Sequence, residues 1–343
     1  MMTKKTVLTG IRANNDLHIG NYFGAMLPMI GMAKQHAGEY NINLFIPDLH
    51  SFTTPIDYSQ LHASIMNNAR VYAAAGLPLD HDAIYMYRQS HIPAHSELTV
   101  LLNNFVGMGE MERMTQYKDK SAKLSNDRVS VGLFDYPVLM ASDILLYNAS
   151  YVPVGDDQTQ HLEITRDIAE RMNAKFGELF TVPEPVAKQH EFFGKDQGLR
   201  IKDLVDPHKK MSKSDETGKG VLFLSDSADD ARKKIMNATT DDKACVAYDK
   251  EQQPGISNLI DILALLRGTS PHAVAEQYAG MERYGEFKQI VASEMAQFLA
   301  EFHANLACID NDALLAKMNA SEQTVSAVAN ATLLRVQQAI GLR

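Results

Sequence analysis

The stretch from Thr6 to Tyr22 decides the fold, and it reads Thr6-Val7-Leu8-Thr9-Gly10-Ile11-Arg12-Ala13-Asn14-Asn15-Asp16-Leu17-His18-Ile19-Gly20-Asn21-Tyr22. It begins as a short apolar strand, passes through a polar loop and ends in the first turn of a helix. This order is typical of the first strand-to-helix turn of a nucleotide-binding α/β unit, where phosphate meets the helix N-terminus. The stretch therefore predicts such a unit at the start of the chain.

A second short string, Lys210-Met211-Ser212-Lys213-Ser214, carries two lysines three residues apart, with Gly218 and Gly220 downstream. Such a flexible cationic loop is suited to close over a polyphosphate and open again. Taken alone, such a lysine pair is more often an ordinary solvated basic turn. Its combination with the first stretch favours the phosphate-binding interpretation.

Strands and helices alternate in the first part of the chain. Strand patterns occur at residues 6–9, 43–47 and 83–87, and helical patterns at residues 21–35, 58–75 and 96–106. This alternation predicts an α/β fold, a Rossmann-like parallel sheet with helices on both faces.

The pattern becomes helical after Gly220, at residues 257–267, 270–278, 285–307 and 321–340. A chain of 343 residues also exceeds what one hydrophobic core usually serves. We therefore expect two domains: residues 1–224 as the Rossmann-like domain, and residues 225–343 as a largely α-helical C-terminal domain.

Four local details follow from turn and capping chemistry. Pro28 lies inside the first helical pattern and should kink it or mark a frayed turn. Asp57 is the expected N-cap of the helix that ends at Gly76. A further helix is expected from Asp135, with Pro137 in its first turn, and residues 152–154 form an expected short strand.

The composition is that of an ordinary globular chain, with 45% hydrophobic and 22% charged residues. No apolar stretch approaches the length of a membrane span and no signal core follows Met1, so we expect a cytoplasmic protein without membrane contact. The net charge of −9 means that nucleic acid would have to meet local basic patches, such as residues 118–128 and 232–234. The two cysteines, Cys245 and Cys308, lack zinc-site spacing and should be free thiols.

Two more segments complete a family resemblance. Residues 155–173 contain Gly155-Asp156-Asp157-Gln158-Thr159-Gln160-His161, and residues 136–147 read Tyr136-Pro137-Val138-Leu139-Met140-Ala141-Ser142-Asp143-Ile144-Leu145-Leu146-Tyr147. With the two signatures above, residues 6–224 resemble the class I aminoacyl-tRNA synthetases. Asn21 stands where most of that class has a second histidine, and this departure resembles the bacterial-type tryptophanyl-tRNA synthetase family. The last third of the chain resembles the family only in length and helical character.

The resemblance implies activation of L-tryptophan by ATP with its bound Mg²⁺, followed by transfer to tRNA(Trp). Such chemistry needs positioning and neutralisation of charge rather than a covalent step by the protein. The implied catalytic residues are Lys210, Lys213, Lys120 and His18, and no protein metal site is expected. The implied ATP-binding residues are Arg12, Ala13, Asn14, Gly20, Asn21, Gly155, Asp156, Asp157, Ile201, Lys210, Met211, Ser212, Lys213 and Ser214.

Asp143 carries the choice of amino acid. It lies within an apolar run, where an ionised carboxylate requires hydrogen-bond donors. Those donors are either groups of the protein itself or, as the resemblance implies, the indole N–H of tryptophan. The implied tryptophan-binding residues are Asp143, Gln158, Met140, Tyr136, His50, Leu8, Val152 and Val154, with Gln158 at the amino group and the apolar members around the ring.

Three other functions remain open at this point. A tyrosine enzyme of the same class would share both signatures but surround a phenol with a tyrosine and aspartate pair. A nucleotidyltransferase of the same superfamily would leave the helical third without a purpose. A catalytically silent paralogue would bind tryptophan or RNA without turnover, although the intact signature residues argue against decay.

The last two expectations concern a loop that departs from the family pattern and the oligomeric state. The loop Arg12-Ala13-Asn14-Asn15 replaces the family's usual Gln-Pro-Ser-Gly, which weakens the ATP assignment of residues 12–14. The resemblance also implies a homodimer with tRNA lying across both subunits and the helical third reading the anticodon.

Overall fold

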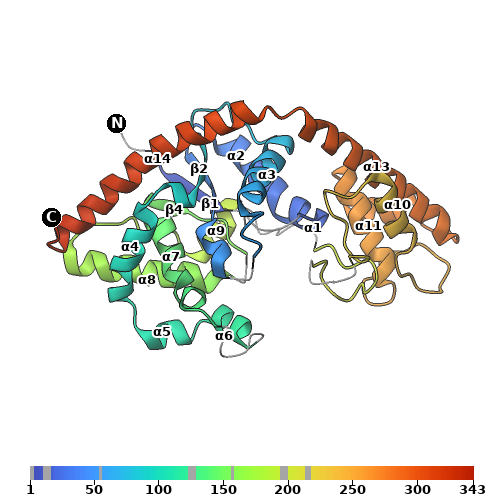
Figure 1. Cartoon of the computed structure of the whole chain (residues 1–343). Helices are drawn as coiled ribbons and strands as arrows, with labels where there is room; N and C mark the ends of the chain where they lie inside the picture. Colours follow the sequence, from blue (N-terminus) through green and yellow to red (C-terminus); the bar gives the residue numbers. More distant parts are fainter. Residues whose placement is uncertain are drawn as a thin grey trace. The chain divides into compact units, whose positions relative to one another are not determined.

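The computed structural model describes residues 4–10, 17–53, 56–122, 129–155, 158–193, 200–212 and 218–343, with the side chain of Lys120 not described. The chain forms two compact units. Unit 1 contains residues 1–15, 32–195 and 310–343, and unit 2 contains residues 16–31 and 196–309. Figure 1 shows their elements along the chain.

A parallel sheet of four described strands forms the centre of unit 1: β1 (Thr6–Gly10), β2 (Asn41–Ile46), β3 (Ile84–Arg88) and β4 (Ala149–Tyr151), in the order β3-β2-β1-β4. Val7 pairs with Ile42, and Leu44 pairs with Met86. The crossover connections and the parallel pairing confirm the predicted Rossmann-like sheet.

Both faces of this sheet are buried. Because successive strand residues point to opposite faces, Leu8, Phe45 and Tyr87 share one face while Val7, Leu44 and Met86 share the other. All six side chains are buried. Burial on both sides is the pattern of a parallel sheet covered by helices.

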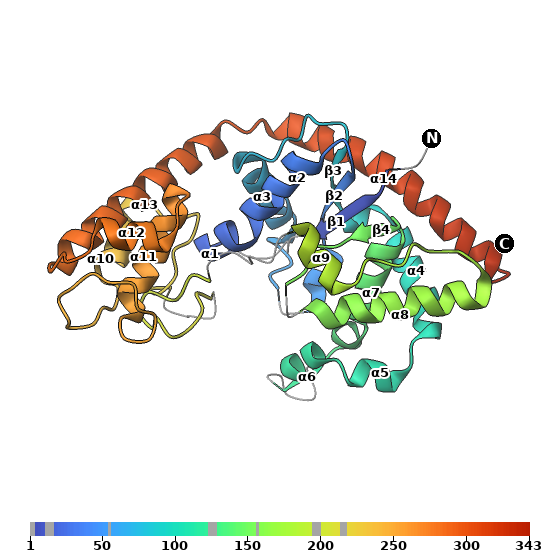
Figure 2. The ribbon, with the colours of Figure 1, turned by 180° about the vertical axis from the view of Figure 1, so that it is seen from behind.

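Helices fill unit 1 around the sheet: α3 (Leu61–Ala74), α4 (Ala94–Leu102), α5 (Met108–Glu112), α6 (Thr115–Ser121), α7 (Val131–Leu145), α8 (Thr159–Phe176) and α9 (Val186–Phe193). Leu98 of α4, Ile144 of α7 and Ile168 of α8 belong to one hydrophobic cluster with Leu8 and Tyr87. This cluster packs α4, α7 and α8 together with residues of the sheet. Figure 2 shows the same unit from behind.

The long helix α14 (Asn311–Ala339) belongs to unit 1, although the sequence placed the whole helical third in one domain. It begins at Asn311 because Asp310 accepts from the backbone N–H of Asp312, which adds ten residues before the expected start at 321. In both views it runs beside β3 and α4, and Val325 and Leu333 join the hydrophobic cluster of that unit. The expected domain boundary at residue 224 therefore differs from the boundaries of the two compact units, because residues 310–343 belong to the unit that contains the sheet.

Unit 2 joins the string His18-Ile19-Gly20-Asn21, called the first signature from here on, to a group of helices. Its helices are α10 (Ala228–Met236), α11 (Pro254–Arg267), α12 (Pro271–Gln277) and α13 (Tyr284–Ala307), which lie near the expected ranges. The first signature supplies α1 (Ile19–Asn21) and a π-helix (Tyr22–Met26), after which α2 (Leu27–His36) crosses into unit 1. Tyr22 packs edge-on against Phe298 and Phe302, with ring centroids 5.2 and 5.8 Å apart.

The π-helix explains how Pro28 is accommodated. The backbone N–H of Leu27 donates to the carbonyl of Tyr22, five residues earlier, instead of the carbonyl four residues earlier. A wider turn directly before a proline relieves the clash that its ring makes in a regular helix.

Three local expectations were wrong at their boundaries. Helix α3 has Gln60 as its N-cap, because the Asp57 carboxylate instead accepts from the backbone and hydroxyl of Ser59. Helix α7 begins at Val131, capped by Ser130, so Pro137 lies in its interior. Residues 152–154 are not a strand; the strand β4 precedes them and ends at Tyr151, because the backbone N–H of Val152 donates to the Gln189 side chain.

Two smaller expectations concern the surface. Cys245 and Cys308 are exposed free thiols, as predicted. None of the described helices is long and apolar enough to cross a membrane.

Candidate functional site

Asp143 of α7 lies at the centre of a buried hydrogen-bond network in unit 1. Its Oδ1 atom accepts from Gln89 Nε2 at 2.7 Å and from His95 Nδ1 at 2.6 Å. Its Oδ2 atom accepts from His50 Nε2 at 2.8 Å. The donors come from three different elements, a 3-10 helix after β2 (Leu49–Thr53), a 3-10 helix after β3 (Gln89–His91) and α4.

This network keeps the carboxylate ionised. Burial by itself raises the pKa of Asp143, but the hydrogen bonds from His50 and His95 outweigh it, and the pKa is lowered. Protein groups therefore satisfy the buried charge, which is the first of the two possibilities raised by the sequence. The role of Asp143 toward an indole remains a prediction.

Of the expected tryptophan-binding residues, some lie beside Asp143 and others belong to the surrounding hydrophobic cluster. His50 contacts it directly, and the His50 and Tyr136 rings lie edge to face at 6.2 Å. The Tyr136 hydroxyl is 2.7 Å from Nε2 of His161 on α8, which orients the ring. The apolar members Leu8, Met140, Val152 and Val154 all belong to or pack against the hydrophobic cluster of unit 1. Gln158 is the N-cap residue of α8.

The first signature is held in unit 2 by main-chain hydrogen bonds. Ile19 donates its backbone N–H to the carbonyl of Leu222 at 2.9 Å, and Leu224 donates to Leu17 at 2.8 Å. His18, between them, forms an antiparallel bridge with Phe223. These bonds place the start of the helical run beside the segment that follows the lysine loop.

Asn21 and Gly20 fit closely around His18. The Asn21 side-chain oxygen accepts from the backbone N–H of His18 at 3.2 Å, which caps the helix start. A Cβ atom on Gly20 would lie 2.9 Å from His18 Nδ1, so a larger residue would displace the buried imidazole. The two residues therefore have a structural role as well as the predicted contact with ATP.

The start of the lysine loop, at Lys210 and Met211, is paired through its backbone with residues 201 and 202. Met211 donates to the carbonyl of Ile201 at 3.1 Å, and Lys202 and Lys210 form an antiparallel bridge. Met211 and Ile201 are buried, whereas Lys210 and Ser212 are exposed. Burial, and secondarily the charge of Lys210, lower the pKa of His18 to about 4. The structure thus brings His18 and Lys210 of the two signatures into electrostatic contact within unit 2.

Several predicted site residues lie outside the described residues: Arg12, Ala13, Asn14, Asp156, Asp157, Lys213, Ser214 and the side chain of Lys120. Gly155, at the edge of one such gap, accepts from the Gln158 backbone at 2.8 Å in the turn before α8. The functional assignments of these residues, and of Gly155, remain predictions.

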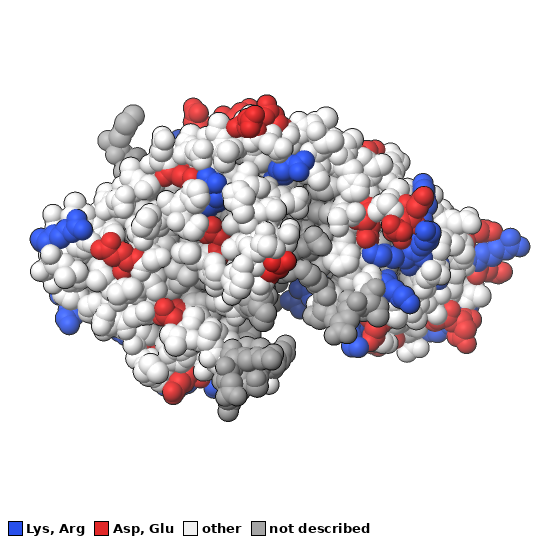
Figure 3. Space-filling model, in the orientation of Figure 1, with Lys and Arg blue, Asp and Glu red and all other residues white. Residues whose placement is uncertain are grey.

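The basic patch at residues 232–234 is largely paired with acids. Arg232 and Lys233 pair with Asp229 and Asp230 on their own helix, at 3.2 and 3.8 Å. Lys234 donates to the Asp226 carboxylate at 2.7 Å. Figure 3 shows the same mixture of Lys and Arg with Asp and Glu on the face in view.

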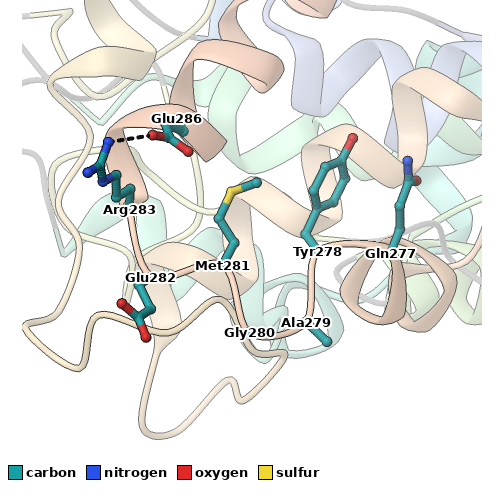
Figure 4. Close-up of a pocket in the computed structure, with 8 residues that line it drawn as sticks. All are labelled: Gln277, Tyr278, Ala279, Gly280, Met281, Glu282, Arg283 and Glu286. Atoms are coloured by element: carbon teal, nitrogen blue, oxygen red, sulfur yellow. Dashed lines mark hydrogen bonds and ion pairs between the residues drawn. The ribbon is translucent and has the colours of Figure 1, made fainter.

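An open hollow of about 510 Å³ lies at the turn between α12 and α13 in unit 2 (Figure 4). It is lined by residues 277–283 and Glu286, and an ion pair of 3.1 Å joins Arg283 to Glu286 across its rim. None of the sequence-predicted site residues lines it, and its lining is mostly a surface turn. Among the described residues, no three His, Cys, Asp or Glu side chains converge as a metal site would require.

Sequence reasoning missed Gln89, His95 and Tyr147, which complete the Asp143 network. The Tyr147 hydroxyl is 2.9 Å from His95 Nε2. Gln89 directly follows β3, and polar residues at the carboxyl end of a parallel strand are a general signal of a site. His95 carries no such signal, because only the packing of α4 against α7 brings it to Asp143. Tyr147, in the turn after α7, joins the network through His95.

Known proteins resemble the chain over its whole length. The pattern of a family described as "tRNA synthetases class I (W and Y)" matches residues 2–300. A relative from Streptomyces avermitilis named tryptophan-tRNA ligase 2 is 41% identical over 341 residues, covering 98% of this chain and 96% of the relative.

Two solved structures are similar as well. Tryptophanyl-tRNA synthetase from Mycoplasma pneumoniae superposes with a TM-score of 0.82 and 31% identity, covering 99% of both chains. The enzyme from Campylobacter jejuni, solved with ADP and tryptophan, gives a TM-score of 0.79 and 30% identity, covering 98% of this chain and 100% of that chain.

Proposed function

This chain belongs to the tryptophan and tyrosine family of class I tRNA synthetases, and on that premise we propose how its residues act as those of a tryptophan-tRNA ligase. The enzyme activates L-tryptophan with ATP to give tryptophanyl-adenylate and pyrophosphate. It then transfers tryptophan to the 3′-terminal adenosine of tRNA(Trp). The alternatives of a tyrosine enzyme and a silent paralogue are not favoured, because the full-length relatives reported above are tryptophan enzymes.

The observation that carries the assignment of specificity is the buried, ionised carboxylate of Asp143. We propose that it accepts the indole N–H of tryptophan. Phenylalanine has no such donor, so binding it would leave a desolvated acceptor unpaired. A site that bonds a substrate N–H rejects the analogue lacking it far more strongly than apolar packing alone can.

The remaining tryptophan contacts come from the residues around Asp143. Tyr136 and His50 already lie against one another and present ring edges and faces, which supports a stacking role toward the indole. Gln158, at the start of α8, is proposed to face the substrate ammonium. The apolar wall is proposed to consist of Leu8, Met140, Val152 and Val154.

ATP activation is proposed to depend on the two signatures of unit 2. The lowered pKa of His18 leaves its imidazole neutral at pH 7, so the ring does not add positive charge beside Lys210. Lys210 and Lys213 are proposed to neutralise the leaving pyrophosphate, with Lys120 as a further cationic contact. The backbone at Gly20 and Asn21 is proposed to meet phosphate at the start of the helical run. Mg²⁺ would enter with the nucleotide and neutralise part of the negative charge of its phosphates.

The other proposals concern the nucleotide's sugar and base, the partners and the cell. Gly155, Asp156 and Asp157 are proposed at the ribose, and the Ile201 backbone at adenine. Two loops are proposed to complete the ATP site, one with Arg12, Ala13 and Asn14 and the other with Met211, Ser212 and Ser214.

We further propose a cytoplasmic homodimer in which residues 225–343 bind the tRNA anticodon, as the family resemblance implies.

ATP–pyrophosphate exchange tests the function directly. Tryptophan should support exchange, whereas tyrosine and phenylalanine should not. Asp143→Asn should lose tryptophan use selectively, because an amide accepts more weakly and can present its NH₂ group to the indole. Exchange that depends on tyrosine, or unchanged selectivity in the variant, would contradict the proposal.

Lys213→Ala tests the lysine loop. The activation rate should fall strongly while tryptophan affinity is nearly unchanged, because the lysine acts on charge that develops in the transition state. A loss confined to the Michaelis constant for ATP would show that the lysine only binds the ground state.

A further inference from the structure

The two oxygens of Asp143 have different hydrogen-bond partners. Oδ1 accepts two bonds, from Gln89 Nε2 at 2.7 Å and from His95 Nδ1 at 2.6 Å. Oδ2 accepts one described bond, from His50 Nε2 at 2.8 Å. A carboxylate oxygen offers about two lone-pair sites, so Oδ1 is saturated while Oδ2 retains capacity for one more donor.

Burial follows the same division. Gln89 and His95, the partners of Oδ1, are both 0% exposed. The His50 side chain, the partner of Oδ2, is 18% exposed. The saturated oxygen therefore faces the protein interior, and the oxygen with spare capacity lies on the side of the network that solvent reaches.

We propose that Gln89 and His95 are positioning residues for tryptophan selection, which occupy Oδ1 of Asp143 and leave Oδ2 as the oxygen that accepts the indole N–H. The inference rests on the proposed function, since it deepens the role of Asp143. It assigns two residues that do not touch the substrate but determine which oxygen can.

Gln89 is itself held in one orientation. Its side-chain Oε1 accepts from the backbone N–H of Leu49 at 3.1 Å, so its NH₂ group must point to Asp143. Leu49 begins the 3-10 helix that carries His50. One buried amide thus links Oδ1 to the segment whose histidine binds Oδ2.

His95 is held in one tautomer in the same way. The Tyr147 hydroxyl lies 2.9 Å from Nε2. Oδ1 of the ionised Asp143 carboxylate can only accept, so Nδ1 of His95 donates to it. Burial raises the pKa of Tyr147, so its hydroxyl keeps the proton that it can donate to Nε2. The chain Tyr147–His95–Asp143 is therefore directional.

Loss of either donor should weaken selection for a physical reason. A carboxylate released at Oδ1 can rotate about its Cβ–Cγ bond, and its freed lone pair becomes a second acceptor in the wrong direction. The contact with the indole N–H then loses its defined geometry. Packing of the ring against the apolar walls is unaffected. The selectivity that should fall is therefore the preference for a substrate that has an indole N–H.

The probe that isolates this contact is 3-(3-benzothienyl)alanine, which keeps the shape of tryptophan but has sulfur in place of N–H. We would measure kcat/KM for ATP–pyrophosphate exchange with tryptophan and with this analogue. In Gln89→Met and in His95→Leu, the ratio of the two values should fall about tenfold, the effect of one weakened charge-assisted hydrogen bond. His95→Asn, which places an amide N–H near the position of Nδ1, should keep most of the ratio.

The matched control is Thr99→Val. Thr99 of α4 donates to the His95 carbonyl at 2.8 Å and lies 3.0 Å from the Ser142 hydroxyl of α7, but it does not bond Asp143. Its ratio should stay at the wild-type value even if its stability falls. Tyr147→Phe, which removes only the hydroxyl that orients His95, should lower the ratio severalfold and serves if His95→Leu does not fold.

The outcomes separate two kinds of failure. If Gln89→Met and Tyr147→Phe fold but lose activity equally with both substrates, the two residues are merely structural and the inference is wrong. If the wild-type enzyme shows no preference for tryptophan over the analogue, the proposed indole contact of Asp143 is wrong instead. Absence of any tryptophan-dependent exchange in the wild type would overturn the proposed function itself.

Discussion

The backbone of Ile19 is hydrogen-bonded to that of Leu222, with the N–H of Ile19 2.9 Å from the Leu222 carbonyl. Ile19 belongs to the first signature, and Leu222 closely follows the second. The two signatures proposed to contact the ATP phosphates are therefore joined by main chain rather than by side chains alone. Tyr22, packed on Phe298 and Phe302, secures the same segment to α13.

Removal of the Asn21 side chain should loosen this segment. Asn21→Ala leaves the His18 backbone N–H without its cap and should cost about 1 kcal/mol. Native-state hydrogen exchange at the Ile19 amide should show the faster opening. Asn21→Asp keeps an acceptor and should keep the protection, while its negative charge slows ATP–pyrophosphate exchange. Equal protection in Asn21→Ala and wild type would remove the capping role.

Acid should destabilise unit 2 through His18. The pKa of His18 is about 4 in the folded chain, against 6.5 for an ordinary histidine, because of burial and then Lys210. The unfolded chain therefore binds the proton more tightly, and stability falls as the pH drops below about 6.5. The loss attributable to His18 between pH 7.5 and pH 5 should be about 2 kcal/mol.

His18→Asn is the comparison that isolates this effect. Urea unfolding of both proteins at pH 7.5 and at pH 5 should give a smaller acid-dependent loss in the variant. Identical losses would mean that other groups account for the acid sensitivity of the wild type.

Lys234 should be a structural residue rather than a free tRNA contact. Its ammonium donates to Asp226 at 2.7 Å and to the Val221 carbonyl at 2.9 Å, and its side chain is only 19% exposed. Lys234→Met should lower the unfolding free energy by about 3 kcal/mol, because Asp226 keeps a partly buried charge without its partner.

Lys233→Met supplies the control on the same helix. Its ammonium is 3.8 Å from Asp230 and its side chain is 73% exposed, so the change should be below about 0.5 kcal/mol. Thermal unfolding by circular dichroism compares the two. Charge reversal to test tRNA binding should accordingly use Arg232 and Lys233 and leave Lys234 intact, with filter binding across a salt series and ATP–pyrophosphate exchange as readouts.

The buried ion pair between Arg88 and Glu322 should hold α14 on unit 1. Arg88 at the end of β3 donates through Nε at 2.6 Å and through an Nη atom at 2.9 Å to the two carboxylate oxygens of Glu322. Glu322→Ala should destabilise unit 1 by about 3 to 5 kcal/mol, because the guanidinium is left buried and unpaired. Protease cleavage within α14 should become faster. The exposed pair Arg283–Glu286 offers the control, since Glu286→Ala should leave that cleavage rate unchanged.

Local patterns predicted the parallel sheet correctly, and they also singled out the two signatures and Asp143, whose roles in binding remain predictions. Each depends on residues that are close in the sequence: an apolar run before a polar turn, two lysines in one loop, or one acid within an apolar helix. The first three strands were placed within about two residues for the same reason.

Features that depend on distant partners could not be predicted in this way. The end of β4 depends on Gln189, and the place of α14 depends on Arg88. The Asp143 network draws on His95, which resembles any other polar residue in a helix, and on Tyr147, which reaches the network only through His95. The π-helix before Pro28 is a further case, since its wider turn follows from the proline and the packing of Tyr22 together.

The position of α14 also bears on how the enzyme is synthesised. Residues 310–343 complete unit 1, yet the ribosome makes them after the whole of unit 2. Arg88 emerges long before Glu322, so the nascent sheet has an unmatched guanidinium while residues 196–309 are already free to fold. We therefore expect unit 2 to reach its native state first during translation, with the nascent chain open to chaperone binding at the site that α14 later covers.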